Sequence, residues 1–340
     1  MYINLRDSYQ LASKLTYKRI KNAFKIYRSF QKARKSKNPE IEGLPISLSI
    51  EPTTACNLRC PECPSGLRSF TRPTGRLQLD LYKKVIDELK DTLFYLILYF
   101  QGEPYLHQQF LELVQYAAEQ NIYTATSTNA HFLDDELAKK TVESGLDRLI
   151  ISIDGATQET YEAYRKTGKL EKVLEGTRNI LKWKKALNSP TPNVVWQFLV
   201  VKPNEHEIPE IKRMARKYGV DQVAFKTAQI YDFENGNELI PTNLKYSRYK
   251  PENNGKWSLK HQIDDECWKM WHSAVITWDG KVVPCCFDKD AQYVMGQMSE
   301  NSFKDIWNSE SYRDFRKTLL DDRNSIEMCR NCTEGGKVWV

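Results

Sequence analysis

Three cysteines fall within the eight residues "CNLRCPEC", at positions 56, 60 and 63. Thiolates at such spacing can hold a metal, but a structural zinc site needs four ligands, usually as two CxxC-like pairs. Neither a fourth cysteine nor a histidine lies close by in the sequence. A [4Fe–4S] cluster held by three thiolates leaves one iron open to a small-molecule chelate, so the missing fourth ligand favours an iron–sulfur site of this kind.

The chain of 340 residues contains eight cysteines, and the other five form a second group near its end: Cys267, Cys285, Cys286, Cys329 and Cys332. In a reducing compartment, clustered cysteines are more often metal ligands or catalytic thiols than disulfides. The sequence therefore predicts two metal-ligand regions.

Alternating strand and helix patterns must position these cysteines. Strands are predicted at 46–50, 95–100, 122–127, 148–153, 194–200 and 222–226, with helices around 79–91, 108–119, 134–144, 170–187 and 206–218. Such alternation implies right-handed crossovers and a parallel sheet, and the absence of a Rossmann glycine fingerprint favours a partial (β/α)6 TIM-like barrel within an α/β fold. Barrel chemistry sits at the carboxyl ends of the strands, and "CNLRCPEC" follows the first of them.

The spacing C-x3-C-x2-C resembles that of the radical SAM superfamily, in which the open iron binds S-adenosylmethionine (SAM). Four further stretches are similar to this family's pattern: "QGEP" at 101–104, "STNA" at 127–130, "SIDG" at 152–155 and "YEAYRKTG" at 161–168. Two positions depart from it, since Gln101 replaces a glycine and Glu62 replaces the aromatic residue common before the third cysteine. The resemblance implies reductive cleavage of SAM to a 5′-deoxyadenosyl radical that abstracts a hydrogen atom from substrate.

The resemblance also implies which residues contact SAM. Gly102 and Glu103 are expected at its amino group, and Ser152 and Arg165 at its ribose hydroxyls or carboxylate. Asn129 is a further candidate. A low-potential electron donor such as flavodoxin or ferredoxin is the expected partner.

The second cysteine group resembles the SPASM/twitch extension of the same superfamily. Four ligands, Cys267, Cys285, Cys329 and Cys332, suffice for one fully ligated auxiliary [4Fe–4S] cluster, with zinc as the alternative. Cys286 is left over, as a packed thiol, a hydrogen-atom donor or an alternative ligand, and it joins Asp288 as a candidate for substrate chemistry. The expected cofactors are therefore SAM and two [4Fe–4S] clusters.

Basic charge is concentrated at the start of the chain. Residues 1–38 carry eleven Lys or Arg and one Asp, in a protein of net charge +6. Apolar residues recur among them at helical spacing, at Leu11, Leu15, Ile20, Phe24, Tyr27 and Phe30. This basic amphipathic helix could pack on the main domain, dock on an anionic membrane surface or bind an acidic partner; no nucleic-acid recognition motif accompanies the charge.

Four regions follow from these patterns. We expect a basic helical segment at 1–43, the radical SAM partial barrel at 44–230, a linker at 231–266 and a small cysteine-rich α+β cluster-binding domain at 267–340. The longest strongly apolar run, 93–100, is too short to cross a bilayer, and residues 1–14 lack the pattern of a secretory signal. The predicted location is cytoplasmic, with peripheral attachment to the membrane as the alternative.

A fully ligated second cluster suits electron transfer, which favours two-electron oxidation of a sugar, cyclitol or other alcohol, as in the aminocyclitol dehydrogenases of this superfamily. A redox-neutral epimerase or dehydratase and a peptide-modifying maturase are the alternatives. The basic helix suggests a variant of the leading prediction, in which the substrate is linked to a lipid. A mere iron–sulfur electron carrier would not need "QGEP", "SIDG" or Arg165.

Overall fold

The computed structural model describes residues 4–261 and 263–333. Its core is a curved sheet in the strand order β11-β10-β9-β1-β2-β3-β4-β5-β6, in which β1 to β6 are parallel neighbours. The strands are β1 (Ser47–Ile50), β2 (Tyr95–Ile97), β3 (Tyr123–Thr128), β4 (Arg148–Ser152), β5 (Asn193–Val200) and β6 (Gln222–Thr227). All six predicted barrel strands are therefore present.

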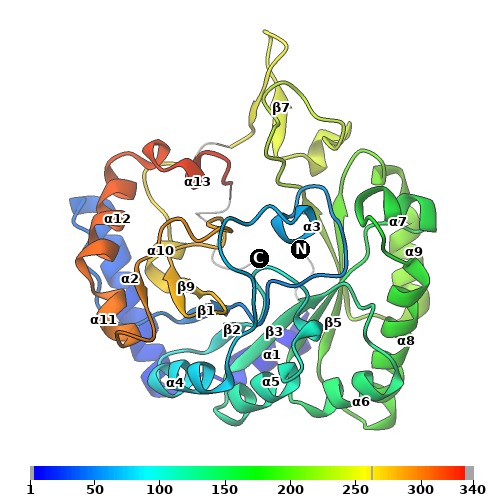
Figure 1. Cartoon of the computed structure of the whole chain (residues 1–340), viewed down its shortest axis with the longest axis horizontal. Helices are drawn as coiled ribbons and strands as arrows, with labels where there is room; N and C mark the ends of the chain where they lie inside the picture. The colour runs from blue at the N-terminus through cyan, green and yellow to red at the C-terminus, as the bar shows by residue number, and fades with distance from the viewer. Residues whose placement is uncertain (1–3, 262, 334–340) are drawn as a thin grey trace.

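Helices cover the outer face of this sheet (Figure 1). They are α4 (Leu79–Leu89), α5 (Phe110–Glu119), α6 (Asp135–Glu143), α7 (Gln158–Tyr164), α8 (Leu170–Ala186) and α9 (Ile208–Tyr218). The ends of these helices carry common capping residues. Asp134 caps the start of α6 by accepting from the Leu137 N–H at 2.8 Å. Gly219 caps the end of α9 with a φ of +78°, which few other residues adopt. The partial barrel predicted from the alternation is confirmed.

The cysteine-rich region does not form a separate sheet. Strand β9 (Ser273–Ile276) pairs in parallel with β1, and β10 (Lys281–Val283) and β11 (Gly296–Gln297) continue the same sheet in antiparallel fashion. Four helices complete the region: α10 (Lys269–His272), α11 (Phe303–Trp307), α12 (Glu310–Asp321) and α13 (Glu327–Arg330). The predicted α+β cluster-binding region is thus joined edge to edge with the barrel.

Residues 231–266, predicted as a linker, contain structure of their own. A 3-10 turn (Leu244–Tyr246) precedes a hairpin of β7 (Tyr249–Pro251) and β8 (Trp257–Leu259), which projects from the top of the molecule in Figure 1. The buried Tyr249 hydroxyl donates to the Ile230 carbonyl and to Asn331 Oδ1, both at 3.0 Å. This segment therefore ties the end of the barrel to the last cysteines.

The N-terminal segment forms two helices, α1 (Leu5–Ser13) and α2 (Tyr17–Ser36), rather than one. The buried face of α2 consists of Arg19, Asn22, Ile26, Ser29, Phe30 and Ala33. Of the apolar residues predicted for the amphipathic face, Phe30 is buried, whereas Ile20, Phe24 and Tyr27 are exposed. Packing on the main domain therefore buries only part of that face.

Polar contacts explain why α2 turns this other face inward. The Arg19 guanidinium donates to the carbonyls of Lys90 at 2.7 Å and Gln120 at 3.0 Å, which lie at the ends of α4 and α5. A cation at helix C-termini satisfies their free carbonyls and complements the helix dipoles. Asn22 exchanges two hydrogen bonds with the Leu44 backbone, at 2.6 and 3.0 Å.

Candidate functional site

The three cysteines lie on the loop that follows β1, at the carboxyl edge of the sheet. Cys60 is buried, and Cys56 and Cys63 are partly buried. The loop is folded tightly on itself, since a Cβ on Gly66 would lie 2.5 Å from the Cys60 nitrogen. Its three sulfurs are free thiols, as ligands of a cluster must be.

The "QGEP" segment passes directly beneath this loop. Gly102 has φ of +76°, and a Cβ there would lie 2.2 Å from the Thr53 carbonyl oxygen. Its N–H donates to Ser65 Oγ at 2.9 Å, and the Glu103 N–H donates to the Ala55 carbonyl at 2.7 Å. Only glycine allows so close an approach, so Gly102 positions the carboxylate of Glu103 beside the cysteine loop.

The Glu103 side chain is buried at the ends of β2 and β3. It accepts from Thr128 Oγ1 at 2.7 Å and from the Asn129 N–H at 2.8 Å. Burial raises the pKa of Glu103 to about 7, in spite of these hydrogen bonds. The Asn129 side chain donates to Asn57 Oδ1, within the cysteine loop, at 2.7 Å. Both predicted residues thus lie beside the first cysteine group.

Arg165 connects the fourth strand to the same loop. Its Nε pairs with Asp154, and its Nη1 donates to the Cys60 sulfur at 3.7 Å. Asp154 is fully buried and also accepts from the Leu199 N–H at 2.7 Å. Ser152 ends β4 and is buried next to it in the chain. Asp154, which we did not single out, fixes the guanidinium; its signal was its place in "SIDG".

The second cysteine group gathers from three separate segments. Cys267 precedes α10, Cys285 follows β10, and Cys329 and Cys332 lie in and just after α13. A hydrogen bond with Cys286 and burial raise the pKa of Cys285, and the nearby thiols of Cys267 and Cys332 add to this rise. Arg323 interacts with Cys267, Cys329 and Cys332 and was not predicted. The four thiols expected to hold the auxiliary cluster therefore lie in the same part of the fold, and their role as its ligands stays a prediction.

Neither group is arranged around a single ion. Across residues 4–261 and 263–333, no three His, Cys, Asp or Glu side chains converge on a point as the ligands of one metal ion would. In a cubane each thiolate binds a different iron, so cluster ligands need not meet at one point. The donor sets, three thiols at the first site and four at the second, fit one open and one fully ligated [4Fe–4S] cluster.

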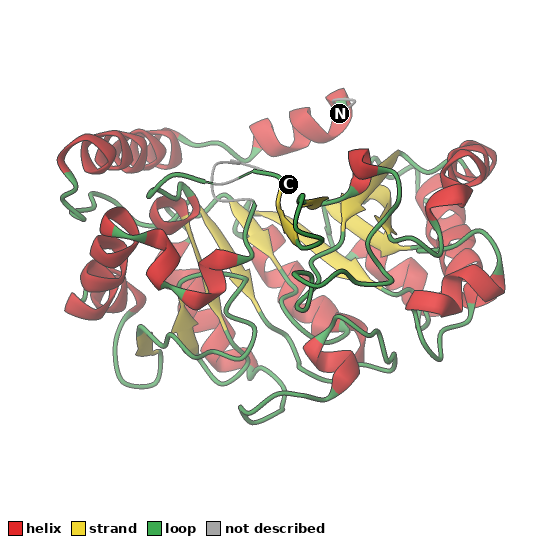
Figure 2. Cartoon of the chain, turned by 90° about the horizontal axis from the view of Figure 1, so that it is seen from above, coloured by secondary structure: helices red, strands yellow, loops and turns green. Residues whose placement is uncertain are grey.

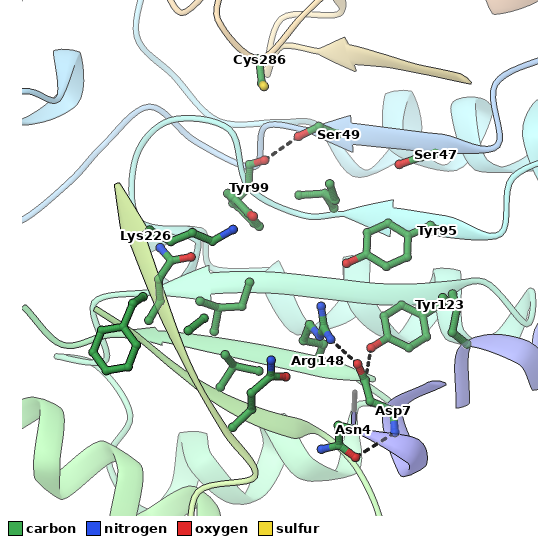
Figure 3. Close-up of a pocket in the computed structure, with 18 of the residues that line it drawn as sticks. Asn4, Asp7, Ser47, Ser49, Tyr95, Tyr99, Tyr123, Arg148, Lys226 and Cys286 are labelled. Carbon is green, nitrogen blue, oxygen red and sulfur yellow. Dashed lines mark hydrogen bonds and ion pairs between the residues drawn. The ribbon is translucent and has the colours of Figure 1, made fainter. Parts of the chain in front are cut away.

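A cavity of about 1360 Å³ lies within the barrel and is lined by Cys285 and Cys286 of the second cysteine group and by Gln101, whose side chain contacts Cys63 of the first. Its upper wall includes Gln101, Cys285, Cys286 and Lys289. Figure 3 shows Cys286 above Ser49 and Tyr99, at the end of the cavity away from Asp7 and Asn4. Cys286 is exposed and lies in the cavity wall, so the expectation of a packed thiol was wrong and its role as a hydrogen donor stays a hypothesis.

Asp288 has a structural role. Its carboxylate accepts from the N–H groups of Gln292 at 2.7 Å and Tyr293 at 2.9 Å, and it is buried away from the cavity. Lys289, beside it, reaches the site instead, donating to the Tyr231 hydroxyl at 2.8 Å. Glu62 accepts from the Tyr231 N–H at 3.1 Å, so it braces this wall.

The lower end of the cavity is closed by α1. Asp7 pairs with Arg148, and the Tyr123 hydroxyl donates to Asp7 (Figure 3). Asn4 donates to Asn193 Oδ1 at 2.7 Å. Arg148, Tyr123 and Asn193 are the first residues of their strands. The helix therefore forms the floor of the barrel.

A partial barrel with three thiols after its first strand and a second thiol group at its edge defines a class of SAM-dependent iron–sulfur enzymes. Residues 50–215 match the radical SAM superfamily model, and residues 267–333 match SPASM, an iron–sulfur cluster-binding domain. The chain belongs to the radical SAM superfamily and carries a C-terminal SPASM domain. Its cofactors are accordingly SAM and [4Fe–4S] clusters.

The chain is similar to proteins with different activities. It is 26% identical over 317 residues to a cofactor-modifying protein for tungsten-containing aldehyde ferredoxin oxidoreductase from Pyrococcus furiosus, covering 84% of this chain and 86% of that protein. It is also 26% identical over 321 residues to a PqqA peptide cyclase from Bradyrhizobium diazoefficiens, covering 86% and 80%.

Solved structures share the fold. The SAM-bound structure of anSMEcpe aligns with a TM-score of 0.63 at 17% identity, covering 86% of each chain. BtrN in complex with SAM and 2-DOIA aligns with a TM-score of 0.51 at 18% identity, covering 86% of this chain and 94% of BtrN. Within the part of the chain that is described, no helix is both long and apolar enough to span a membrane.

Proposed function

We propose that the protein oxidises a small hydroxyl-bearing substrate, such as a sugar, a cyclitol or another alcohol, by two electrons. When bound, SAM and its cluster supply the radical that abstracts a hydrogen atom, and the auxiliary cluster supplies an electron acceptor. One observation carries the proposal: the same cavity is bordered by Gln101, beneath the first cysteine loop, and by Cys285 of the second group. A substrate in this cavity lies between the two sites.

The lining of the cavity supports a polar substrate. Side chains of Ser47, Ser49, Gln101, Gln197 and Lys226 contribute hydroxyl, amide and amino groups to its wall. Tyrosines at 95, 99 and 123 provide flat surfaces beside them. Aromatic faces together with a few fixed polar groups are a common combination in small-molecule pockets, where the polar groups set orientation.

The chain's own residues have separable tasks in this proposal. Glu103 and Arg165, held by Asn129 and Asp154, would orient SAM at the cysteine loop. Lys289, which lines the cavity and donates to the Tyr231 hydroxyl, would contact the substrate. Cys267, Cys285, Cys329 and Cys332 would hold the auxiliary cluster.

A peptide substrate is the second candidate, and the comparisons favour it. One relative is a PqqA peptide cyclase, and SuiB from Streptococcus suis, solved with its precursor peptide SuiA, aligns with a TM-score of 0.60. A redox-neutral epimerisation or dehydration is the third, because Cys286 lies in the cavity wall where a thiol could return a hydrogen atom.

The test uses anaerobically reconstituted enzyme with SAM and a low-potential donor such as flavodoxin or ferredoxin. We expect a panel of sugars and cyclitols to contain a compound that stimulates 5′-deoxyadenosine release and yields an equal amount of carbonyl product. Stimulation by peptides alone would overturn the small-molecule proposal. Release with a stereoisomer as product, and no carbonyl compound, would favour epimerisation.

A further inference from the structure

A stripe of large apolar side chains on α1 and α2 faces away from the barrel. The exposed fractions are 81% for Leu5, 72% for Tyr9, 79% for Tyr17, 54% for Ile20, 60% for Phe24 and 52% for Tyr27. The four on α2 are spaced i, i+3, i+7 and i+10, which places them on one face of the helix. Figure 2 shows both helices along the same edge of the molecule.

Packing on the opposite face of α2 fixes this orientation. Phe30 packs against Trp268 and Trp271, with ring centroids 5.1 and 5.4 Å apart. Arg19 is buried with its guanidinium hydrogen-bonded to backbone carbonyls of three loops. The helix cannot roll to bury Ile20 and Phe24 without breaking these contacts, so the apolar stripe is a stable part of the surface.

Positive charge runs beside the stripe. Exposed cations follow the neighbouring face of α2 at Lys18, Lys21, Lys25, Arg28, Lys32 and Lys35. Lys18 is paired with Asp91 at 2.8 Å. The single acidic residue among positions 1–38, Asp7, is buried and paired with Arg148, so it does not offset the exposed charge.

We propose that the α1–α2 surface, formed by the six exposed apolar residues and the cations from Lys21 to Lys35, docks on an anionic membrane leaflet. An amphipathic helix with aromatic and aliphatic side chains on one side and Lys and Arg beside them lies in the bilayer interface. Tyrosine rings suit that boundary, because one end is apolar and the other polar. The excess of positive charge selects anionic lipid over a neutral surface.

The test is co-sedimentation of the full-length, cluster-loaded protein with vesicles. Phosphatidylcholine vesicles that contain phosphatidylglycerol are compared with pure phosphatidylcholine vesicles. We expect binding to the first only, and we expect it to weaken as salt rises, because the Debye length falls from about 10 Å at 0.1 M to about 3 Å at 1 M. A Lys21→Glu, Lys25→Glu variant is expected to bind at least about tenfold more weakly.

Matched variants make the result specific. Ile20→Ser with Phe24→Ser should abolish binding while retaining the iron content and visible absorption of the clusters. Leu187→Ser, at an exposed leucine after α8, and Lys185→Glu with Lys217→Glu, at exposed lysines of α8 and α9, should bind like the unmodified protein. The two lysine changes match Lys21→Glu with Lys25→Glu in residue type, number and exposure, and Leu187→Ser is a single control at an exposed aliphatic side chain.

Three results would overturn the proposal. The first is absence of binding to the anionic vesicles, and the second is equal binding to both vesicle types. The third is a concentration-dependent dimer, seen by light scattering without vesicles, that Ile20→Ser with Phe24→Ser converts to monomer. In that case a second copy of the chain covers the stripe.

Discussion

Arg165 donates to the sulfur of Cys60 from a guanidinium that is held in place by the buried carboxylate of Asp154. The Arg165–Asp154 pair joins the end of β4 to the loop after β1. The positive charge of Arg165 therefore lies next to Cys60, a proposed cluster ligand. A charge-assisted hydrogen bond of this kind stabilises the thiolate of Cys60. It also fixes the orientation of the Arg165 guanidinium, which would contact SAM.

Asp154→Asn should lower SAM cleavage by about tenfold to a hundredfold while the clusters remain, since loss of a residue that orients a ligand has effects of that size. The carboxamide can still accept from the Leu199 N–H but no longer carries the charge that pairs with Arg165. Initial rates of 5′-deoxyadenosine formation measure the change. Glu171→Gln, at an exposed partner of Arg178, is the control, and an unchanged rate for Asp154→Asn would contradict the assignment.

Two cubanes require about eight iron atoms per reconstituted chain. Replacing Cys56, Cys60 and Cys63 by alanine should leave about four and abolish SAM cleavage, because the second group of thiols is far away in the sequence. Iron analysis and 5′-deoxyadenosine assays measure both. Four iron atoms with bound zinc in the unmodified protein would contradict the auxiliary cluster.

Cys329→Ala should spare some 5′-deoxyadenosine formation and eliminate oxidised product, since it removes a ligand of the second group alone. Cys286→Ala is the companion variant, because it changes the neighbouring thiol in the cavity wall but none of the seven proposed ligands. Loss of product in Cys286→Ala with full iron content would identify a hydrogen donor and favour epimerisation. Normal product formation by Cys329→Ala would rule out an electron-accepting role.

SAM binding should strengthen as pH rises toward 8. Burial raises the pKa of Glu103 to about 7, so below that pH the protonated side chain must lose its proton to pair with the amino group of SAM. The dissociation constant is expected to be about tenfold larger at about pH 6 than at about pH 8. Anaerobic calorimetry checks this, and Glu103→Gln should remove the pH dependence; a flat profile for the unmodified enzyme would contradict it.

Arg72→Met should lower the thermal midpoint by about 5 to 10 °C, because removing one partner of a buried ion pair costs about 3 to 5 kcal/mol. Arg72 donates to the two oxygens of Glu51 at 2.8 and 2.6 Å, and both side chains are buried. Arg72→Met with Glu51→Gln should recover part of the loss, since the uncompensated carboxylate is gone. Equal midpoints for the single and double variants would mean that Arg72 acts through its packing.

Sequence alone could predict the parts of the site whose positions depend on which strand they follow in the chain. Gly102, Glu103, Asn129 and Ser152 follow or end parallel strands, whose carboxyl ends meet at one edge, so their approach to the cysteine loop follows from the strand assignment. Arg165 was expected from its motif. Its partner Asp154 belongs to the "SIDG" stretch, but its contact with Arg165 depends on how the chain folds after β4, which the motif does not specify.

The rest depends on contacts between distant segments. Pairing of β9 with β1 joins residues more than two hundred positions apart, and hydrophobic periodicity carries no information about such a partner. The face of α2 that is buried depends on contacts of the same kind. Periodicity favours burial of Ile20 and Phe24, but Arg19 and Asn22 face inward because carbonyl groups of other segments are available to them.

Helix α1 is shared between the cavity and the outer surface. Asp7 forms part of the cavity floor through Arg148 and Tyr123, and two residues to either side Leu5 and Tyr9 point outward. A molecule that contacts Asp7 from within and a surface that holds Leu5 and Tyr9 from without therefore act on the same nine-residue helix. If attachment to that surface changes the affinity for the substrate by some factor, binding of the substrate must change the affinity for the surface by the same factor.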